Sequence, residues 1–384
     1  MTTPARQLVL KLHSRCNLSC TYCYVYEHND QSWRRQPRTM SHQTVDLVAR
    51  RIAEHAGERR LPRFTVTLHG GEPLMAGAEL IEYTVTTIAA AVPPETRVDF
   101  TIQTNGILLT ADLLELFDRL GLRVGVSLDG GRVANDRHRR FSNGGGSYDK
   151  VREALTLIRQ ERFAHLFSGL LCVVDLRNDP LDVYRDLVAF APPRIDFLLP
   201  HGNWTTPPPG KEPASPSTPY ADWLIPIFDL WYAEPQTVDI RLFSSIMALL
   251  VGEPSRTEAV GLKRSAALVV ETDGSIEQVD SLKTTAPDMA ATGFDIDTHT
   301  FDQALAHPAI EAQYRGLSGL APGCQRCPIV SVCGGGMYAH RYRDGDFLNP
   351  TVFCADQLKL IQHIRRRLFA DLEALRGSTA TTAG

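Results

Sequence analysis

Short apolar runs alternate with longer amphipathic segments through the first half of the chain. The short runs favour β-strands, while the segments between them repeat apolar residues at helical spacing. We expect strands at 6–12, 63–70, 97–104, 122–130, 168–175 and 194–200, and helices around 42–56, 77–91, 110–120, 147–161 and 180–190. This alternation predicts an α/β fold in which parallel strands, joined by right-handed helical crossovers, form a barrel or partial barrel.

The second half of the chain follows a different pattern. Residues 202–219 are dense in Pro, Ser, Thr and Gly, which excludes a helix or a central strand and indicates a loop or linker. We therefore expect a barrel domain over 1–200, a linker over 201–220, a second domain over 221–376 and a disordered tail over 377–384. Within the second domain we expect helices at 222–234, which Pro226 weakens, at 241–252 and, as an amphipathic helix, at 354–375. The pattern of 266–282 alternates around Asp273-Gly274, which predicts a hairpin with a two-residue turn.

Composition limits the class of protein. The chain has 384 residues, 43% of them apolar and 22% charged, which is typical of a soluble globular enzyme with one large core and a smaller second unit. A formal charge of -4 gives no basic face for nucleic acid and no membrane patch. The N-terminus shows no signal peptide and no transmembrane run, so we expect a cytoplasmic protein.

Seven of the eight cysteines fall into two groups, which indicates metal binding rather than disulfides in a reducing compartment. The first group is Cys16, Cys20 and Cys23, and the second is Cys324, Cys327, Cys333 and Cys354. The eighth, Cys172, lies in an apolar strand and reads as a buried core residue.

Three thiols at C-x3-C-x2-C spacing leave one position of a four-ligand metal site open. His13 or His28 could close the site as a zinc knuckle. Tyr22, Tyr24 and Tyr26 lie between and after the thiols and suit either stacking on a planar group or ordinary packing.

The three-cysteine loop resembles the signature of the radical S-adenosylmethionine (SAM) enzymes, and other segments extend the resemblance. "GGEP" at 70–73, "QTNG" at 103–106 and "SLDG" at 127–130 follow three of the predicted strands, where barrel enzymes carry their functional groups. The resemblance implies a partial (β/α)6 barrel, a [4Fe–4S] cluster on the three thiolates, and SAM on the free fourth iron, which yields a 5′-deoxyadenosyl radical on reduction. The implied SAM contacts are Tyr22, Gly70, Gly71, Glu72, Pro73, Gln103, Asn105, Ser127, Asp129 and Arg139.

The second cysteine group resembles the C-terminal SPASM extension of radical SAM peptide maturases. That extension commonly carries seven cysteines and two auxiliary clusters, whereas here Val279 and Met337 stand at two of the cysteine positions. The four cysteines that remain match one auxiliary [4Fe–4S] cluster, so we expect two clusters in total; a structural zinc is the alternative. In sulfatase-maturing relatives an aspartate at the position of Asp280 is a candidate base, and a solvated hairpin carboxylate is the alternative interpretation.

Across nearly its whole length the chain is most similar to the FxsB-type, cyclophane-forming group of SPASM maturases. The resemblance implies a ribosomally made precursor peptide, in which a bond joins an aromatic ring to a Cβ within a three-residue motif, and a cellular electron donor. With no room for a leader-binding domain before the barrel, we expect leader recognition elsewhere in the chain or in another polypeptide. The alternatives are a sulfatase-type maturase and a zinc-stabilised peptide-binding module without radical chemistry.

Overall fold

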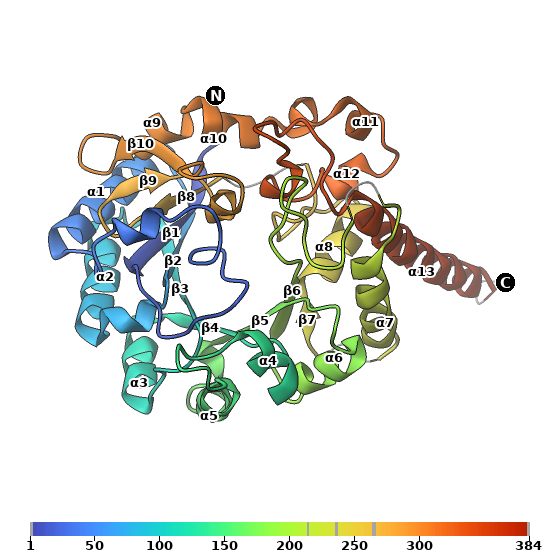
Figure 1. The fold of residues 1–384 in the computed structure, drawn as a ribbon, viewed down its shortest axis with the longest axis horizontal. Helices are drawn as coiled ribbons and strands as arrows, with labels where there is room; N and C mark the ends of the chain where they lie inside the picture. Colours follow the sequence, from blue (N-terminus) through green and yellow to red (C-terminus); the bar gives the residue numbers. More distant parts are fainter. Residues whose placement is uncertain (1–2, 213–214, 235–236, 263–265, 382–384) are drawn as a thin grey trace.

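A single curved sheet organises the protein (Figure 1). The computed structural model describes residues 3–212, 215–234, 237–262 and 266–381, with side chains through residue 374. In these residues, ten strands follow the spatial order β10-β9-β8-β1-β2-β3-β4-β5-β6-β7. The strands are β1 (Ala5–His13), β2 (Arg63–Gly70), β3 (Arg97–Thr104), β4 (Arg123–Ser127), β5 (Phe167–Val173), β6 (Arg194–Leu198), β7 (Asp239–Ile240), β8 (Ala266–Val270), β9 (Ser275–Glu277) and β10 (Ala291–Asp295). All neighbouring pairs from β8 to β7 are parallel, and β9 and β10 add antiparallel pairs at one edge.

Helices connect the parallel strands and lie along the outer side of the sheet (Figure 1). They are α1 (His42–Glu58), α2 (Ala78–Ala91), α3 (Ala111–Leu120), α4 (Arg132–His138), α5 (Tyr148–Ile158) and α6 (Pro180–Val188), with short 3-10 turns η1 (Ser32–Arg34), η2 (Pro73–Ala76) and η3 (Ala164–Leu166). Side-chain caps fix several starts: Ser41, Thr110 and Asp179 each accept a backbone N–H at the beginning of α1, α3 and α6. The expected α/β partial barrel is confirmed. Helix α4 was not predicted, because it is too short to show a clear helical periodicity in the sequence.

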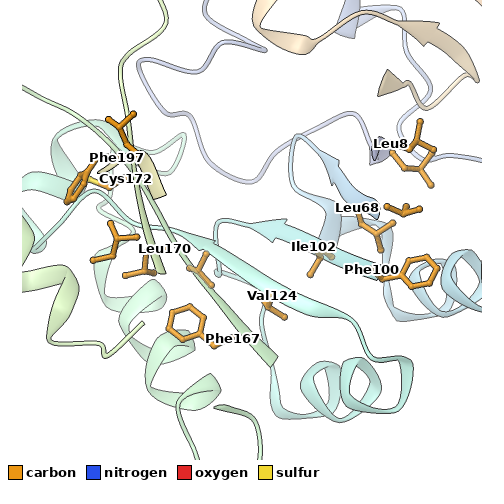
Figure 2. Close-up of a cluster of buried hydrophobic side chains, with 14 of the residues drawn as sticks. Leu8, Leu68, Phe100, Ile102, Val124, Phe167, Leu170, Cys172 and Phe197 are labelled. Carbon is orange, nitrogen blue, oxygen red and sulfur yellow. The ribbon is translucent and has the colours of Figure 1, made fainter. Parts of the chain in front are cut away.

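The core lies between the sheet and these helices, and Figure 2 shows part of it. Strands contribute every second residue, as in β2, where Phe64, Val66 and Leu68 are fully buried between partly exposed neighbours. Cys172 on β5 is 1% exposed within this core, as expected for a structural cysteine.

The C-terminal half completes both edges of the sheet. Described residues between β6 and α7 (Pro219–Ala233) contain no helix or strand, as the Pro-rich composition predicts. Beyond this segment β7 pairs with β6, α8 (Arg241–Leu250) follows, and β8 returns to pair with β1. The division into domains stays a proposal. The same sheet includes strands from both sides of the Pro-rich segment.

Short helices and one long helix end the chain. They are η4 (Asp280–Thr284), α9 (Phe301–Leu305), α10 (Pro308–Gln313), η5 (Gly316–Gly319), α11 (Pro322–Gln325), α12 (Val330–Cys333), η6 (Ala339–Arg341) and α13 (Cys354–Thr381). α13 packs against α7 and α8 (Figure 1). No helix among the described residues is long and apolar enough to cross a membrane.

Two sequence predictions need correction. The tail expected to be disordered from 377 is helical through Thr381, because one glycine at 377 costs a helix only about 1 kcal/mol; residues 382–384 lie outside the described residues. The turn between β8 and β9 is longer than two residues, since the Glu271 N–H donates to the Ser275 carbonyl at 3.0 Å. Gly274 accommodates the turn with φ of +93°.

Candidate functional site

The loop after β1 brings Cys16, Cys20 and Cys23 into one partly buried site. The Cys23 N–H donates to the Cys20 carbonyl at 3.0 Å, and the Leu18 N–H lies 3.4 Å from the Cys16 sulfur. Burial raises the pKa of all three thiols, that of Cys16 to about 12, and each thiolate lies close enough to another to add to the effect. Thiolates at such a site need a compensating positive charge, which a bound metal supplies.

The "GGEP" segment is bound to this loop through its backbone. The Gly71 N–H donates to the His13 carbonyl at 2.9 Å, and the Glu72 N–H donates to the Arg15 carbonyl at 3.0 Å. A Cβ at Gly71 would lie 1.9 Å from the Tyr26 hydroxyl oxygen, so only glycine fits there. The end of β2 and the three-cysteine loop are therefore one rigid unit.

The Glu72 carboxylate is buried at the centre of this unit. It accepts hydrogen bonds from the Leu74 N–H at 3.0 Å, the Thr104 hydroxyl at 2.7 Å and the Asn105 N–H at 2.8 Å. Burial outweighs these donors and raises the carboxyl pKa. Pro73 follows as the first residue of η2. Glu72 thus fixes the segment to the end of β3, and its side chain is taken up by these hydrogen bonds.

Three further predicted residues, Gln103, Asn105 and Ser127, lie at the ends of β3 and β4. The Gln103 amide donates to the Ser127 hydroxyl at 2.9 Å. The Asn105 amide donates to the Asn17 side-chain oxygen at 2.7 Å and lies 3.7 Å from the Cys16 sulfur. Asn105 therefore connects the β3 end to the cysteine loop.

Tyr22, Asp129 and Arg139 form a third buried group beside Cys20. The Tyr22 hydroxyl donates to Asp129 and accepts from the Arg139 guanidinium at 3.0 Å, while the Val173 N–H donates to the other Asp129 oxygen at 3.0 Å. Burial raises the pKa of Tyr22 and of Asp129. The Arg139 Nε is buried without a hydrogen-bond partner among the described groups, so it can donate to an anionic ligand.

The second cysteine group gathers where α11, α12 and α13 meet. Cys324, Cys327, Cys333 and Cys354 lie close enough to influence one another's ionisation, and burial raises the pKa of Cys333 to about 11. Val279, which the resemblance places at a vacated cysteine position, packs against a small apolar cluster that includes Leu282.

Asp280 begins η4 and is not a solvated hairpin carboxylate. Its Oδ1 lies 2.6 Å from the Lys11 Nζ, and only 12% of its side chain is exposed. Lys11 on β1 also pairs with Glu271 at 2.7 Å and is itself 3% exposed. His69 on β2 is the register partner of Lys11, and burial lowers its imidazole pKa, so that ring is neutral near pH 7.

Tyr24 and His201 lie on the other side of Asp280. Their ring centroids are 5.1 Å apart, and the Asp280 charge acts on both rings. Burial lowers the pKa of His201 to about 4. A phenol and two neutral imidazoles thus lie within electrostatic reach of the Asp280 carboxylate.

Comparison with known families identifies the chemistry of the first half. The Radical SAM superfamily pattern matches residues 10–186, which include the cysteine loop, the "GGEP" segment and Arg139. The protein is a radical SAM enzyme. The superfamily match implies SAM and a [4Fe–4S] cluster as cofactors.

Relatives of this radical SAM enzyme include peptide-modifying proteins. The cysteine-type anaerobic sulfatase-maturating enzyme of Clostridium novyi is 24% identical over 90% of this chain and 91% of its own. The serine-type enzyme of Bacteroides thetaiotaomicron is 28% identical over 72% and 69%. The structure of native anSMEcpe with bound AdoMet has a TM-score of 0.81, 21% identity, and covers 95% of this chain and 98% of that chain. Streptococcus suis SuiB bound to precursor peptide SuiA has a TM-score of 0.60, 12% identity, and covers 92% and 76%.

The residues of this radical SAM enzyme fit the cofactors that the superfamily implies. Three desolvated thiols suit a cluster with one open iron, and the donors at Leu18 and Asn105 suit its sulfur ligands. The unpartnered Nε of Arg139 suits the SAM carboxylate. Asp129, whose two oxygens are taken by Tyr22 and Val173, would act by orienting Tyr22 rather than by contact.

Sequence reasoning missed the charged residues around Asp280. Lys11, Glu271, Glu277 and Lys283 come from β1, the β8–β9 turn, β9 and η4. Only Lys11 carried a signal, as the single charge inside the apolar run "LVLKL".

Proposed function

We propose that this radical SAM enzyme matures a ribosomally made peptide by forming a carbon–carbon bond between an aromatic ring and a Cβ within a three-residue motif. Two sets of observations support a peptide substrate. Sulfatase-maturating enzymes are similar over most of the chain, and the fold matches that of a protein solved with its precursor peptide. The four thiols of the second cysteine group support one auxiliary cluster. Val279, which packs in an apolar cluster, offers no ligand for a second one.

The position of Asp280 supports the step that both candidate reactions share, the acceptance of a proton. Its carboxylate is held by Lys11, which lies two residues before His13, the residue that ties the cysteine loop to Gly71. A proton acceptor is therefore fixed relative to the loop that holds the cluster.

The chain's own residues then have distinct tasks. When bound, the cluster and SAM supply a deoxyadenosyl radical that removes a hydrogen atom from a C–H bond. Asp280 accepts the proton that the ring loses as aromaticity returns. The electron released with that proton needs an acceptor, for which the four-cysteine site is the candidate. Tyr24, His69 and His201 surround the reacting side chains.

A sulfatase-type oxidation of Cys or Ser is the second candidate, favoured by the similarity to the two curated maturating enzymes. It also uses a base at Asp280. Against it stand Val279 and Met337, which remove ligands that a second auxiliary cluster would need. The match to the radical SAM superfamily favours either reaction over a zinc-stabilised binding module.

Co-expression with precursor peptides encoded near this chain, followed by mass spectrometry, tests the proposal. A cross-link removes two hydrogen atoms, leaves no aldehyde, and suppresses backbone fragmentation within the linked motif. A product that reacts with a hydrazine probe is an aldehyde and would assign the sulfatase-type reaction instead. Asp280→Asn should abolish product while SAM cleavage continues; undiminished product would exclude Asp280 as the base.

A further inference from the structure

Five buried charged side chains form an alternating row that ends at Asp280. We call Asp280, Lys11, Glu271, Lys283 and Glu277 the charge row. The Lys11 Nζ lies 2.6 Å from Asp280 and 2.7 Å from Glu271, and the Lys283 Nζ lies 2.6 Å from Glu271 and 2.8 Å from Glu277. Each of the two ammonium groups therefore bridges two carboxylates.

The charge row is costly to bury and is not explained by stability. Side-chain exposure is 2–4% for Lys11, Lys283 and Glu271, 7% for Glu277 and 12% for Asp280. Removing each ion from water costs several kcal/mol, and a buried ion pair often stabilises no better than apolar residues of the same volume. Such an arrangement suggests a task in the chemistry.

The three carboxylates are close enough to influence one another directly. One oxygen from each of Glu271, Glu277 and Asp280 lies within 4.8 Å of the others. With all five groups ionised the charge row carries a net charge of -1, since two ammonium groups face three carboxylates. The Lys11 and Lys283 ammonium groups supply positive charge to these three carboxylates through their ion pairs.

Glu277 and Lys283 lie at the opposite end of this series of ion pairs from Asp280. Glu277 ends β9, and Lys283 lies three residues after Asp280 on the same 3-10 turn, η4. Lys283 and Lys11 share the Glu271 carboxylate. The charge on Lys283 therefore affects how strongly Glu271 attracts the Lys11 ammonium, which also pairs with Asp280.

We propose that Glu277 and Lys283 are positioning residues, which set the orientation and electrostatic environment of Asp280 through Glu271 and Lys11. The proposal rests on the proposed role of Asp280 as proton acceptor. In this proposal the charge row, rather than a metal ligand at the neighbouring Val279, holds the Asp280 carboxylate in place.

The charge of Glu277 changes near neutral pH. Burial and the Glu271 carboxylate raise its pKa to about 7, while Lys283 opposes the shift. The other titratable groups around the charge row are Tyr24, His69 and His201, and the Asp280 charge acts on all three. Above about pH 7, Glu277 adds a negative charge within 4.8 Å of an Asp280 oxygen, and this charge favours transfer of a proton to that carboxylate.

Infrared spectroscopy of the holoenzyme tests this without any substrate. The carboxylate band of Asp280 is assigned by subtraction of the Asp280→Asn spectrum and followed with pH. In the wild type we expect its frequency to shift with a midpoint near pH 7. Glu277→Gln should abolish that step. Lys283→Met removes the ammonium beside Glu277 and should move the step upward by about one to three pH units.

The matched control is Arg241→Met, which removes the partner of another buried carboxylate, Asp196 on β6, outside the charge row. It should leave the Asp280 step unchanged. A wild-type band without a step, or the same step in Glu277→Gln, overturns the proposal. Should Asp280→Asn still modify peptide fully, the base role fails, while the infrared result still decides whether the charge row acts on Asp280.

Once a precursor peptide is found, product formed per 5′-deoxyadenosine gives a second measurement. In the wild type this ratio should rise through about pH 7. Glu277→Gln should give a flat profile, which a merely structural role, visible only as lost stability, would not produce. A wild-type profile in Glu277→Gln would contradict the proposal.

Discussion

Glu277→Gln should stabilise the protein at alkaline pH and leave its stability unchanged at acid pH. The folded state raises the pKa of this carboxyl from 4.5 to about 7, so the native protein keeps a proton that the unfolded chain releases between those values. The stabilisation from that proton is complete below pH 4.5 and is lost as the pH rises through about 7. Glutamine resembles the protonated carboxyl and cannot ionise.

The size of this stability difference follows from the difference between the folded-state and unfolded-state pKa values of Glu277. A shift from 4.5 to about 7 corresponds to about 3 kcal/mol of unfolding free energy lost by the wild type at pH 8. With an unfolding entropy of about 2.1 cal/mol/K per residue, that equals roughly 4 °C in melting temperature for 384 residues. At pH 5, where the folded state keeps the Glu277 proton and the unfolded chain binds only part of one, the difference should shrink to roughly 1 °C.

Thermal or urea unfolding of the reduced, iron-free protein at pH 5 and pH 8 measures the difference. Glu82→Gln, on the exposed face of α2, is the control and should behave as wild type at both pH values. A variant less stable than wild type at pH 8 would show that the Lys283–Glu277 ion pair outweighs the burial cost. The reasoning would then be refuted.

Three other changes test the cofactor sites. Gly71→Ala should lower SAM cleavage by more than about tenfold, because the new Cβ would lie 1.9 Å from the Tyr26 hydroxyl oxygen. The control Gly57→Ala, whose Cβ has no neighbour nearer than 3.6 Å, should keep its activity. Equal activities of the two variants would contradict the close packing at Gly71. Cys354→Ala should reduce iron from about eight to about four per chain with SAM cleavage retained, and full iron content would exclude the auxiliary cluster. Arg139→Lys should weaken SAM binding by about tenfold in calorimetry without loss of the first cluster, because lysine lacks the planar donor fork; unchanged affinity would place the carboxylate elsewhere.

Local sequence patterns predicted the fold well because they report local physics. The strand runs at 6–12 and 63–70 match β1 and β2 closely, since alternating burial is written in their residues. The end of β4 was placed too late. Asp129 and Gly130 form a buried turn there, with Gly130 at φ of +112°, a conformation that apolar periodicity does not reveal.

Motif spacing located the residues that a cofactor would meet, and missed those that act through other side chains. The cysteines, "GGEP" and Arg139 are recognisable because a ligand demands particular residues at fixed offsets. Glu277 and Lys283 satisfy only each other and Glu271, so nothing in their own segment distinguishes them from surface charges. Their burial depends on β1, β8 and β9 meeting in one sheet, which is a property of the folded chain.

β1 explains how two chemically different sites stay in register. Lys11 and His13 are two residues apart on this strand; the Lys11 ammonium holds Asp280, and the His13 carbonyl holds the Gly71 N–H beside the cysteine loop. A strand rises about 3.3 Å per residue, so the two anchor points are separated by about 7 Å of stiff backbone. In the proposed reaction, radical formation and proton acceptance act on the same bound peptide, and a shared strand fixes the separation of the two sites.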